Sequence, residues 1–73
     1  MNYNVNMAWD EKSEVWIATS DDIPGLTLES GSFDALIERV HFVVPELLEL
    51  NGQNPTFPLP LVFHSECKIN LVA

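Results

Sequence analysis

Hydrophobic and polar side chains alternate along residues 3–9, at the start of the chain. The apolar face carries Tyr3, Val5, Met7 and Trp9. Successive side chains of a strand point to opposite faces, so this alternation predicts a half-buried strand. Residues 10–13 form a polar connection of hairpin length. A second strand is predicted over residues 14–20, which are rich in β-branched and aromatic side chains. Both faces of this second strand are partly apolar, so the pattern leaves its buried face open.

The strand pattern is interrupted at Asp21-Asp22-Ile23-Pro24-Gly25. Pro24 cannot donate a hydrogen bond to a sheet, and Gly25 permits a tight backbone path. A third, short strand is predicted directly afterwards, over residues 26–29. We therefore expect Asp22, Pro24 and Gly25 to form a structural turn that sets the order of the strands.

The hydrophobic period changes from strand-like to helical after Gly31 and Ser32. These two residues are expected to start a helix over residues 33–50, with Ser32 as its N-cap. The apolar stripe consists of Phe33, Leu36, Ile37, Val40, Val44, Leu47 and Leu48. Pro45 lies inside this helix, where it removes a backbone donor and crowds the preceding turn. We expect a kink or a break there.

Residues 61–72 carry the longest strand pattern of the chain, with largely apolar odd positions and largely polar even ones. This strand is expected either to join its own sheet or to pair with a neighbouring subunit beyond the sheet edge. Residues 1–73 are therefore predicted to form a single α+β domain. Its predicted order is β-β-β-α-β, with an antiparallel sheet and one helix packed across it.

The chain has 73 residues, near the small end of the domains that fold without a disulfide or a metal. A single cysteine excludes an intramolecular disulfide, while 47% of the residues are hydrophobic. We therefore expect a homo-oligomer, a dimer or a tetramer, in which association buries further apolar surface.

The charge is strongly acidic, with 3 basic and 11 acidic residues and a net charge of −8. Nucleic-acid binding depends on clustered lysines and arginines, so direct binding to DNA or RNA is not expected. An acidic surface favours a basic protein partner. The alternative is that the charge serves solubility alone.

The first residues show neither a basic region nor a long apolar run, so no secretory signal is expected. No segment has the length of a membrane span. The single cysteine is consistent with a reducing compartment. We expect a cytoplasmic protein that does not bind membranes.

No residue pattern indicates catalysis, a cofactor or a metal. His41 and His64 belong to different predicted elements, and with Cys67 they give no metal-ligand spacing. Cys67 falls on the apolar face of the last strand and is expected to be buried. Asp21 and Asp22 could serve as metal ligands or as an acid–base pair, but adjacent aspartates also suit a turn. An enzyme is not expected.

Phe42 is the candidate for a partner contact. On a helical wheel it lies opposite the apolar stripe, near Glu38, Glu46 and Glu49. An exposed aromatic side chain among carboxylates is typical of a protein interface. The alternative is that a kink at Pro45 rotates the helix and buries Phe42.

Two segments resemble the HicB family of antitoxins: Asp22-Ile23-Pro24-Gly25-Leu26 and Gly31-Ser32-Phe33-Asp34-Ala35-Leu36. They follow a polar hairpin and a strand that contains Trp16, as in that family. Val44-Pro45-Glu46-Leu47-Leu48 and Asn51-Gly52 are most similar to a small HicB-like group of unknown function. The resemblance covers residues 3–52, and the last strand fits the family's β-β-β-α-β order.

The resemblance implies a partial double-stranded-RNA-binding-like fold that acts as a protein-binding module. HicB antitoxins cover a small basic RNase toxin, HicA, and block its RNA-binding surface. The leading hypothesis is therefore a non-enzymatic, HicB-like module of a toxin–antitoxin system that binds a basic, HicA-like toxin. The alternative is a self-assembling domain of unknown function with no toxin partner. A third hypothesis is an enzyme that uses Asp21 and Asp22 as metal ligands.

Overall fold

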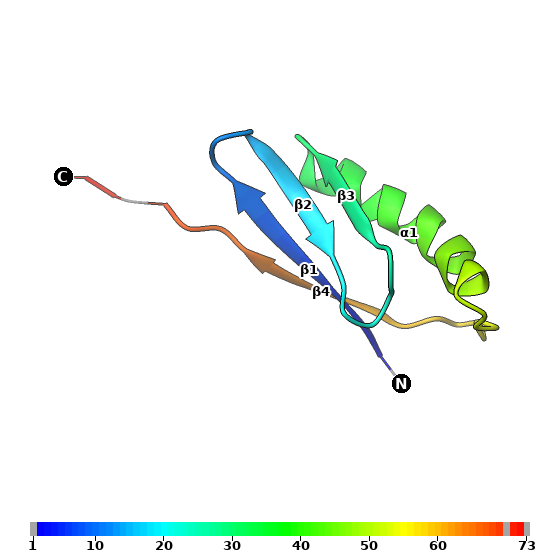
Figure 1. Ribbon diagram of the computed structural model, residues 1–73. Coiled ribbons are helices and arrows are strands. Elements are labelled where there is room, and N and C mark those ends of the chain that lie inside the picture. The colour runs from blue at the N-terminus through cyan, green and yellow to red at the C-terminus, as the bar shows by residue number, and fades with distance from the viewer. Residues whose placement is uncertain (1, 70, 73) are drawn as a thin grey trace.

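The computed structural model describes residues 2–69, 71 and 72, which form one sheet and one helix (Figure 1). The elements are β1 (Tyr3–Asp10), β2 (Val15–Thr19), β3 (Thr27–Ser30), α1 (Phe33–Leu50) and β4 (Leu61–Glu66). This order confirms the α+β class and the β-β-β-α-β arrangement.

The four strands lie in the order β3-β2-β1-β4. The pairs β1–β2 and β2–β3 are antiparallel, whereas β4 runs parallel to β1, so the sheet is mostly but not wholly antiparallel. The connector over residues 51–60 explains this direction. It returns the chain to the start of β1, where the Tyr3 N–H donates to the Pro60 carbonyl at 2.9 Å.

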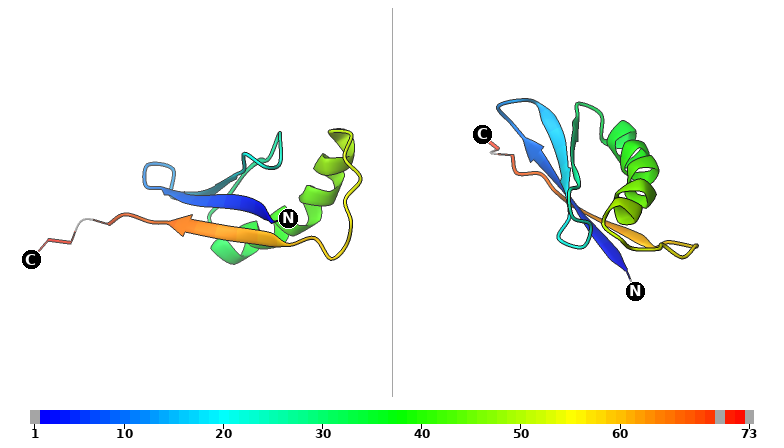
Figure 2. Two further views of the ribbon diagram at one scale, coloured as in Figure 1. Left: turned by 90° about the horizontal axis from the view of Figure 1, so that it is seen from below. Right: turned by 45° about the vertical axis from the view of Figure 1, so that its right-hand side comes forward.

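One face of the sheet packs against α1, which lies beside β3 and β2 (Figure 2). The buried core consists of Val5, Met7, Ala18, Ile23, Leu26, Leu36, Val40, Val44 and Leu48. The helix supplies four of these side chains at a spacing of four residues, as the predicted stripe requires. The opposite face of β1 is exposed at Asn4, Asn6 and Ala8.

The buried face of β2 is the one that carries Trp16 and Ala18. Ala18 is fully buried, and the Trp16 ring packs edge-on against Phe33 with ring centroids 4.8 Å apart. Trp16 also lies 5.5 Å from the ring of Trp9, its partner in the β1–β2 register. These aromatic contacts join the hairpin to the first turn of the helix.

The helix passes through Pro45 without a break, so of the expected kink or break the break does not occur. Pro45 leaves the carbonyl of His41, four residues earlier, without its usual helical donor. His41 is exposed, so water can satisfy that oxygen.

The last strand is shorter than predicted, because β4 ends at Glu66 and not at residue 72. Its pairing with β1 ends at Ala8, opposite Glu66, and the following chain leaves the sheet (Figure 1). Cys67 is consequently exposed, and the prediction of a buried cysteine is wrong. Alternation alone does not bury a side chain where no neighbouring strand or helix lies beside it.

Candidate protein-interaction surface

Phe42 projects from the outer side of α1 and is 71% exposed. Glu38 and Glu46 lie one turn before and after it, and Glu49 follows at the next helical step. All three glutamates are exposed. We call the stripe formed by Glu38, Phe42, Glu46 and Glu49 the acidic helix face. Of the two alternatives for Phe42, the structure shows the exposed one.

A shallow hollow lies beside Phe42 on the N-terminal half of the helix. Asp34, Ile37, Glu38, His41 and Phe42 line it. Ile37 is half-buried, and the ring of His41 stands nearly perpendicular to that of Phe42, with centroids 5.7 Å apart. Carboxylates next to an aromatic ring can hold a lysine or arginine side chain through ionic, hydrogen-bond and cation–π contacts.

The sequence prediction did not include Asp34 or His41 in this surface. The signal was present in the helical spacing, because residues three and four apart are neighbours on a helix. Asp34 is one turn before Glu38, and His41 is one turn after Ile37. The hollow therefore extends the acidic helix face towards the start of α1.

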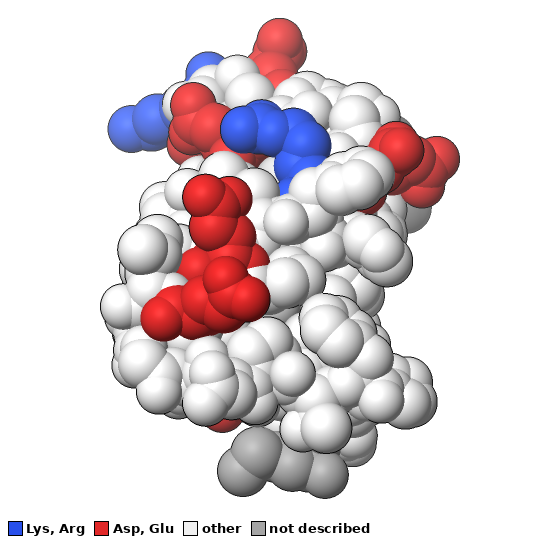
Figure 3. All heavy atoms as spheres, turned by 90° about the vertical axis from the view of Figure 1, so that its right-hand side faces the viewer, with Lys and Arg blue, Asp and Glu red and all other residues white. Residues whose placement is uncertain are grey.

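Arg39 is the basic residue of α1, and it is directed towards the sheet. Its Nη1 donates to the Glu29 carbonyl on β3 at 3.0 Å. With 3 basic residues against 11 acidic ones in the chain, most carboxylates have no basic residue available to neutralise them. Figure 3 shows one side of the molecule, where groups of carboxylates lie among uncharged side chains and the visible lysine and arginine atoms lie near the top of the view.

The segment predicted as a structural turn is a tight turn in which Leu26 N–H donates to the Ile23 carbonyl at 3.2 Å. Pro24 fits the second position of a type II turn, and Gly25 has the positive φ, 87°, that the third position requires. Ile23 and Leu26 are both buried on either side. The Asn51 side-chain amide donates to the Pro24 carbonyl at 2.9 Å, which ties the turn to the end of α1.

Asp22 joins this turn to β1. Its Oδ2 accepts the Asn4 backbone N–H at 2.7 Å and the Asn4 side-chain amide at 3.0 Å. The backbone bond, followed by the side-chain bond, lowers the pKa of Asp22 below its usual value. The Asn4 Oδ1 then faces His64 Nε2 at 2.9 Å, so this ring nitrogen donates to it. The network connects the turn, β1 and β4.

The second predicted step, Gly31-Ser32, starts the helix. Ser32 is the N-cap: its Oγ accepts the Ala35 N–H at 3.2 Å, and Asp34 lies in the first turn. Gly31 does not have a positive φ, and a side chain there would reach the Glu14 carbonyl only at van der Waals distance, 3.9 Å. Geometry requires a glycine at position 25 but not at position 31.

Among the described residues, no three histidine, cysteine, aspartate or glutamate side chains are placed to hold a metal ion together. Of the adjacent aspartates, Asp22 uses its carboxylate to bind Asn4. In the same part of the chain, no helix is long and apolar enough to cross a membrane.

Comparison with known proteins identifies relatives without an assigned activity. The family described as a domain of unknown function, DUF1902, matches residues 2–72. The chain is also similar to the crystal structure of hypothetical protein TTHA1013 from the extremely thermophilic bacterium Thermus thermophilus. The two share 37% sequence identity with a TM-score of 0.74, and the match covers 100% of each chain. A search of curated proteins gives no significant match.

Proposed function

The chain belongs to the DUF1902 family of domains of unknown function, and from this premise we propose that it is a non-enzymatic, HicB-like module that binds a small basic protein. The observation that supports this most is the acidic helix face. Phe42 is 71% exposed there, although a side chain of this size and apolarity is normally covered. Covering it on binding would give the partner an aromatic anchor of the kind that dominates protein interfaces.

The surroundings of Phe42 favour a basic partner. Glu38, Glu46 and Glu49 would attract lysine and arginine side chains, and the Phe42 ring would accept one of them over its face. The net charge of −8 would speed the encounter with a cationic protein. The same charge opposes direct contact with a phosphate backbone, so nucleic acid is not part of this proposal.

The resemblance to HicB antitoxins supports a particular kind of partner. The turn at Pro24-Gly25, the helix start at Gly31-Ser32 and the β-β-β-α-β order of elements along the chain resemble the pattern of that family. By this analogy the partner is a small, basic, HicA-like RNase toxin, and the chain acts in the cytoplasm by covering the toxin's RNA-binding surface. Neither a catalytic group nor a cofactor is needed for such a role.

The test is to purify the tagged chain from the organism that encodes it and to identify proteins present in stoichiometric amount. The product of the neighbouring reading frame is then titrated by calorimetry against wild type and Phe42→Ser. We expect one small basic protein to co-purify and Phe42→Ser to weaken its binding at least tenfold. The melting temperature should be almost unchanged, because Phe42 lies outside the core.

Phe57→Ser is the matched control, since Phe57 is 67% exposed in the connector and is not part of the acidic helix face. It should leave binding unchanged. Binding that is insensitive to Phe42→Ser would contradict the use of this face. Self-association with no other protein present would favour the alternative, a self-assembling domain without a toxin.

A further inference from the structure

β4 leaves one edge of the sheet unpaired. The strand pairs with β1 on one side, and no strand of the described chain lies on its other side. The Tyr3 N–H donates to the Pro60 carbonyl, directly before β4. In β4, the even-numbered residues therefore direct their backbone N–H and C=O groups towards β1. Leu61, Phe63 and Ser65 therefore direct theirs outward. Leu61–Glu66 contains neither proline nor lysine, the residues that commonly protect such an edge.

The chain beyond β4 carries exposed apolar side chains. Ile69, Leu71 and Val72 are 79%, 93% and 86% exposed, the largest values among the exposed large hydrophobic residues of the described chain. Figure 1 shows this segment leading away from the sheet. Three such side chains lie within four residues, and no other part of the described chain covers them.

We propose that β4 and the segment after it pair antiparallel with the same residues of a second copy, about a two-fold axis at Cys67. In this register Glu66 lies opposite Lys68 of the second copy. Phe63 lies opposite Leu71 of the second copy, and Val62 lies opposite its Val72. Each copy thus covers the free edge of the other with its exposed segment, as a two-fold interface requires.

Two observations determine the proposed register: the side of the sheet on which each side chain lies, and the charges of Glu66 and Lys68. Antiparallel pairing about Cys67 joins odd positions to odd ones, so apolar Phe63 and Leu71 share the helix side of the sheet. The outward main-chain groups of Phe63 and Ser65 then make the ladder bonds, and Glu66 and Lys68 occupy a closer, non-hydrogen-bonded pair. With the two-fold axis at residue 66, the Glu66 side chains of the two copies would face each other. With the axis at residue 68, the two Lys68 side chains would face each other, and like charges directly opposite repel.

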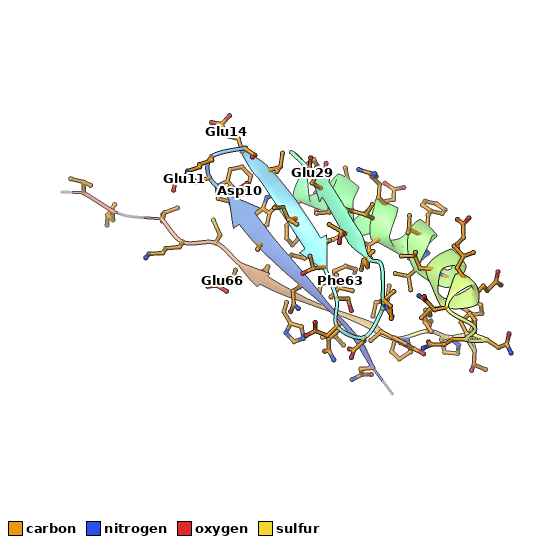
Figure 4. All side chains as sticks on the ribbon, viewed as in Figure 1. Asp10, Glu11, Glu14, Glu29, Phe63 and Glu66 are labelled. Atoms are coloured by element: carbon orange, nitrogen blue, oxygen red, sulfur yellow. The ribbon has the colours of Figure 1, made fainter. Side chains whose placement is uncertain are left out.

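This interface goes beyond the proposed binding of a basic protein, and it uses a different surface. Figure 4 labels Glu66 at the end of β4, where the chain leaves the sheet; the acidic helix face belongs to α1. The dimer can therefore exist with or without the basic partner. Failure of one proposal leaves the other standing.

Sedimentation equilibrium tests the dimer and its register. Wild type is expected to be a dimer whose dissociation constant rises about tenfold in Lys68→Glu, because two attractive cross-strand pairs become repulsive. Glu66→Lys should weaken it similarly, and the double variant Glu66→Lys/Lys68→Glu should restore association. A monomeric wild type, or a dimer indifferent to all three variants, overturns the proposal.

A second measurement uses the native thiol. In the proposed register the two Cys67 residues form a hydrogen-bonded pair, whose Cα atoms are about 5.5 Å apart, within the Cα range of a disulfide. Mild oxidation should therefore give a covalent dimer through Cys67. The control is Ser13→Cys in a Cys67→Ser background, which moves the thiol to the exposed β1–β2 turn. Equal cross-linking of both proteins would show random collision and contradict the two-fold axis.

Discussion

Asn4 holds Asp22 by two hydrogen bonds to the same carboxylate oxygen, one from its backbone at 2.7 Å and one from its side chain at 3.0 Å. The residues are 18 positions apart, so the contact fixes the turn after β2 against the first strand. It gives an acidic residue of the predicted turn a structural role that local sequence does not reveal. The same contact predicts that the stability of the domain depends on pH.

These bonds lower the pKa of Asp22 below its usual value of 3.8. A group whose pKa is depressed by folding stabilises the folded state fully above its unfolded pKa, and this contribution is lost as pH falls through the folded pKa. We expect thermal stability to decline as the pH is lowered below about 3.8, and Asp22→Asn to flatten that part of the profile. Melting temperatures measured from strongly acidic to neutral pH check this.

Asp21→Asn is the matched control for that profile, because it removes a carboxylate from the same turn and leaves both Asn4 bonds in place. It should keep the acid-dependent loss of stability. Identical profiles for Asp22→Asn and wild type would show that Asp22 contributes nothing to the pH dependence.

The two glycines that flank β3 should respond differently to substitution by alanine. Gly25 has φ 87°, a region that costs an L-residue about 1–2 kcal/mol. Gly31 does not have a positive φ, and a side chain there meets its nearest atom at 3.9 Å. Gly25→Ala should lower the free energy of unfolding by about 1–2 kcal/mol, whereas Gly31→Ala should be close to neutral. Urea denaturation of the two variants separates these cases, and equal losses would contradict the turn geometry.

The helix could be predicted with its observed bounds, Phe33–Leu50, because its signals are local. Ser32 caps it, Asn51-Gly52 ends it, and the apolar stripe selects the buried side. The exposure of Phe42 required the structure, because a helical wheel cannot say whether Pro45 rotates the outer face inward. Within α1, local rules therefore predicted the scaffold of the candidate site but not the exposure of its central residue.

The last strand shows where local rules fail. Alternation continues through residue 72, but a strand also needs a partner for its hydrogen bonds, and the pairing with β1 ends at Ala8. The prediction that Cys67 is buried was wrong for the same reason. The parallel direction of β4 was likewise not readable from the pattern, since it depends on the path of residues 51–60.

Glu14 marks a site where a substitution should stabilise the domain. It is exposed in the turn between β1 and β2, with φ 54°, in the left-handed region. Glu14→Gly should remove the penalty that an L-residue has in this region, while glycine adds entropy to the unfolded chain. The net effect should be a rise of about 0.5–1 kcal/mol in the free energy of unfolding. Glu11→Gly removes the same charge from the same turn at a residue without a positive φ. It should give no gain, and an equal gain would assign the effect to charge.

Leu36 and Phe42 lie on opposite sides of α1, and their truncation should affect stability to very different extents. Leu36 is fully buried in the core, while Phe42 is 71% exposed. Leu36→Ala should cost about 2–5 kcal/mol of unfolding free energy, because it removes buried methyl groups and leaves a cavity. Phe42→Ala should change stability by less than about 0.5 kcal/mol, as expected for a surface position. Denaturant titrations at one dilute protein concentration make the comparison, since association would otherwise add to stability. A loss of several kcal/mol in Phe42→Ala would place the ring in the core and remove the acidic helix face as a binding surface.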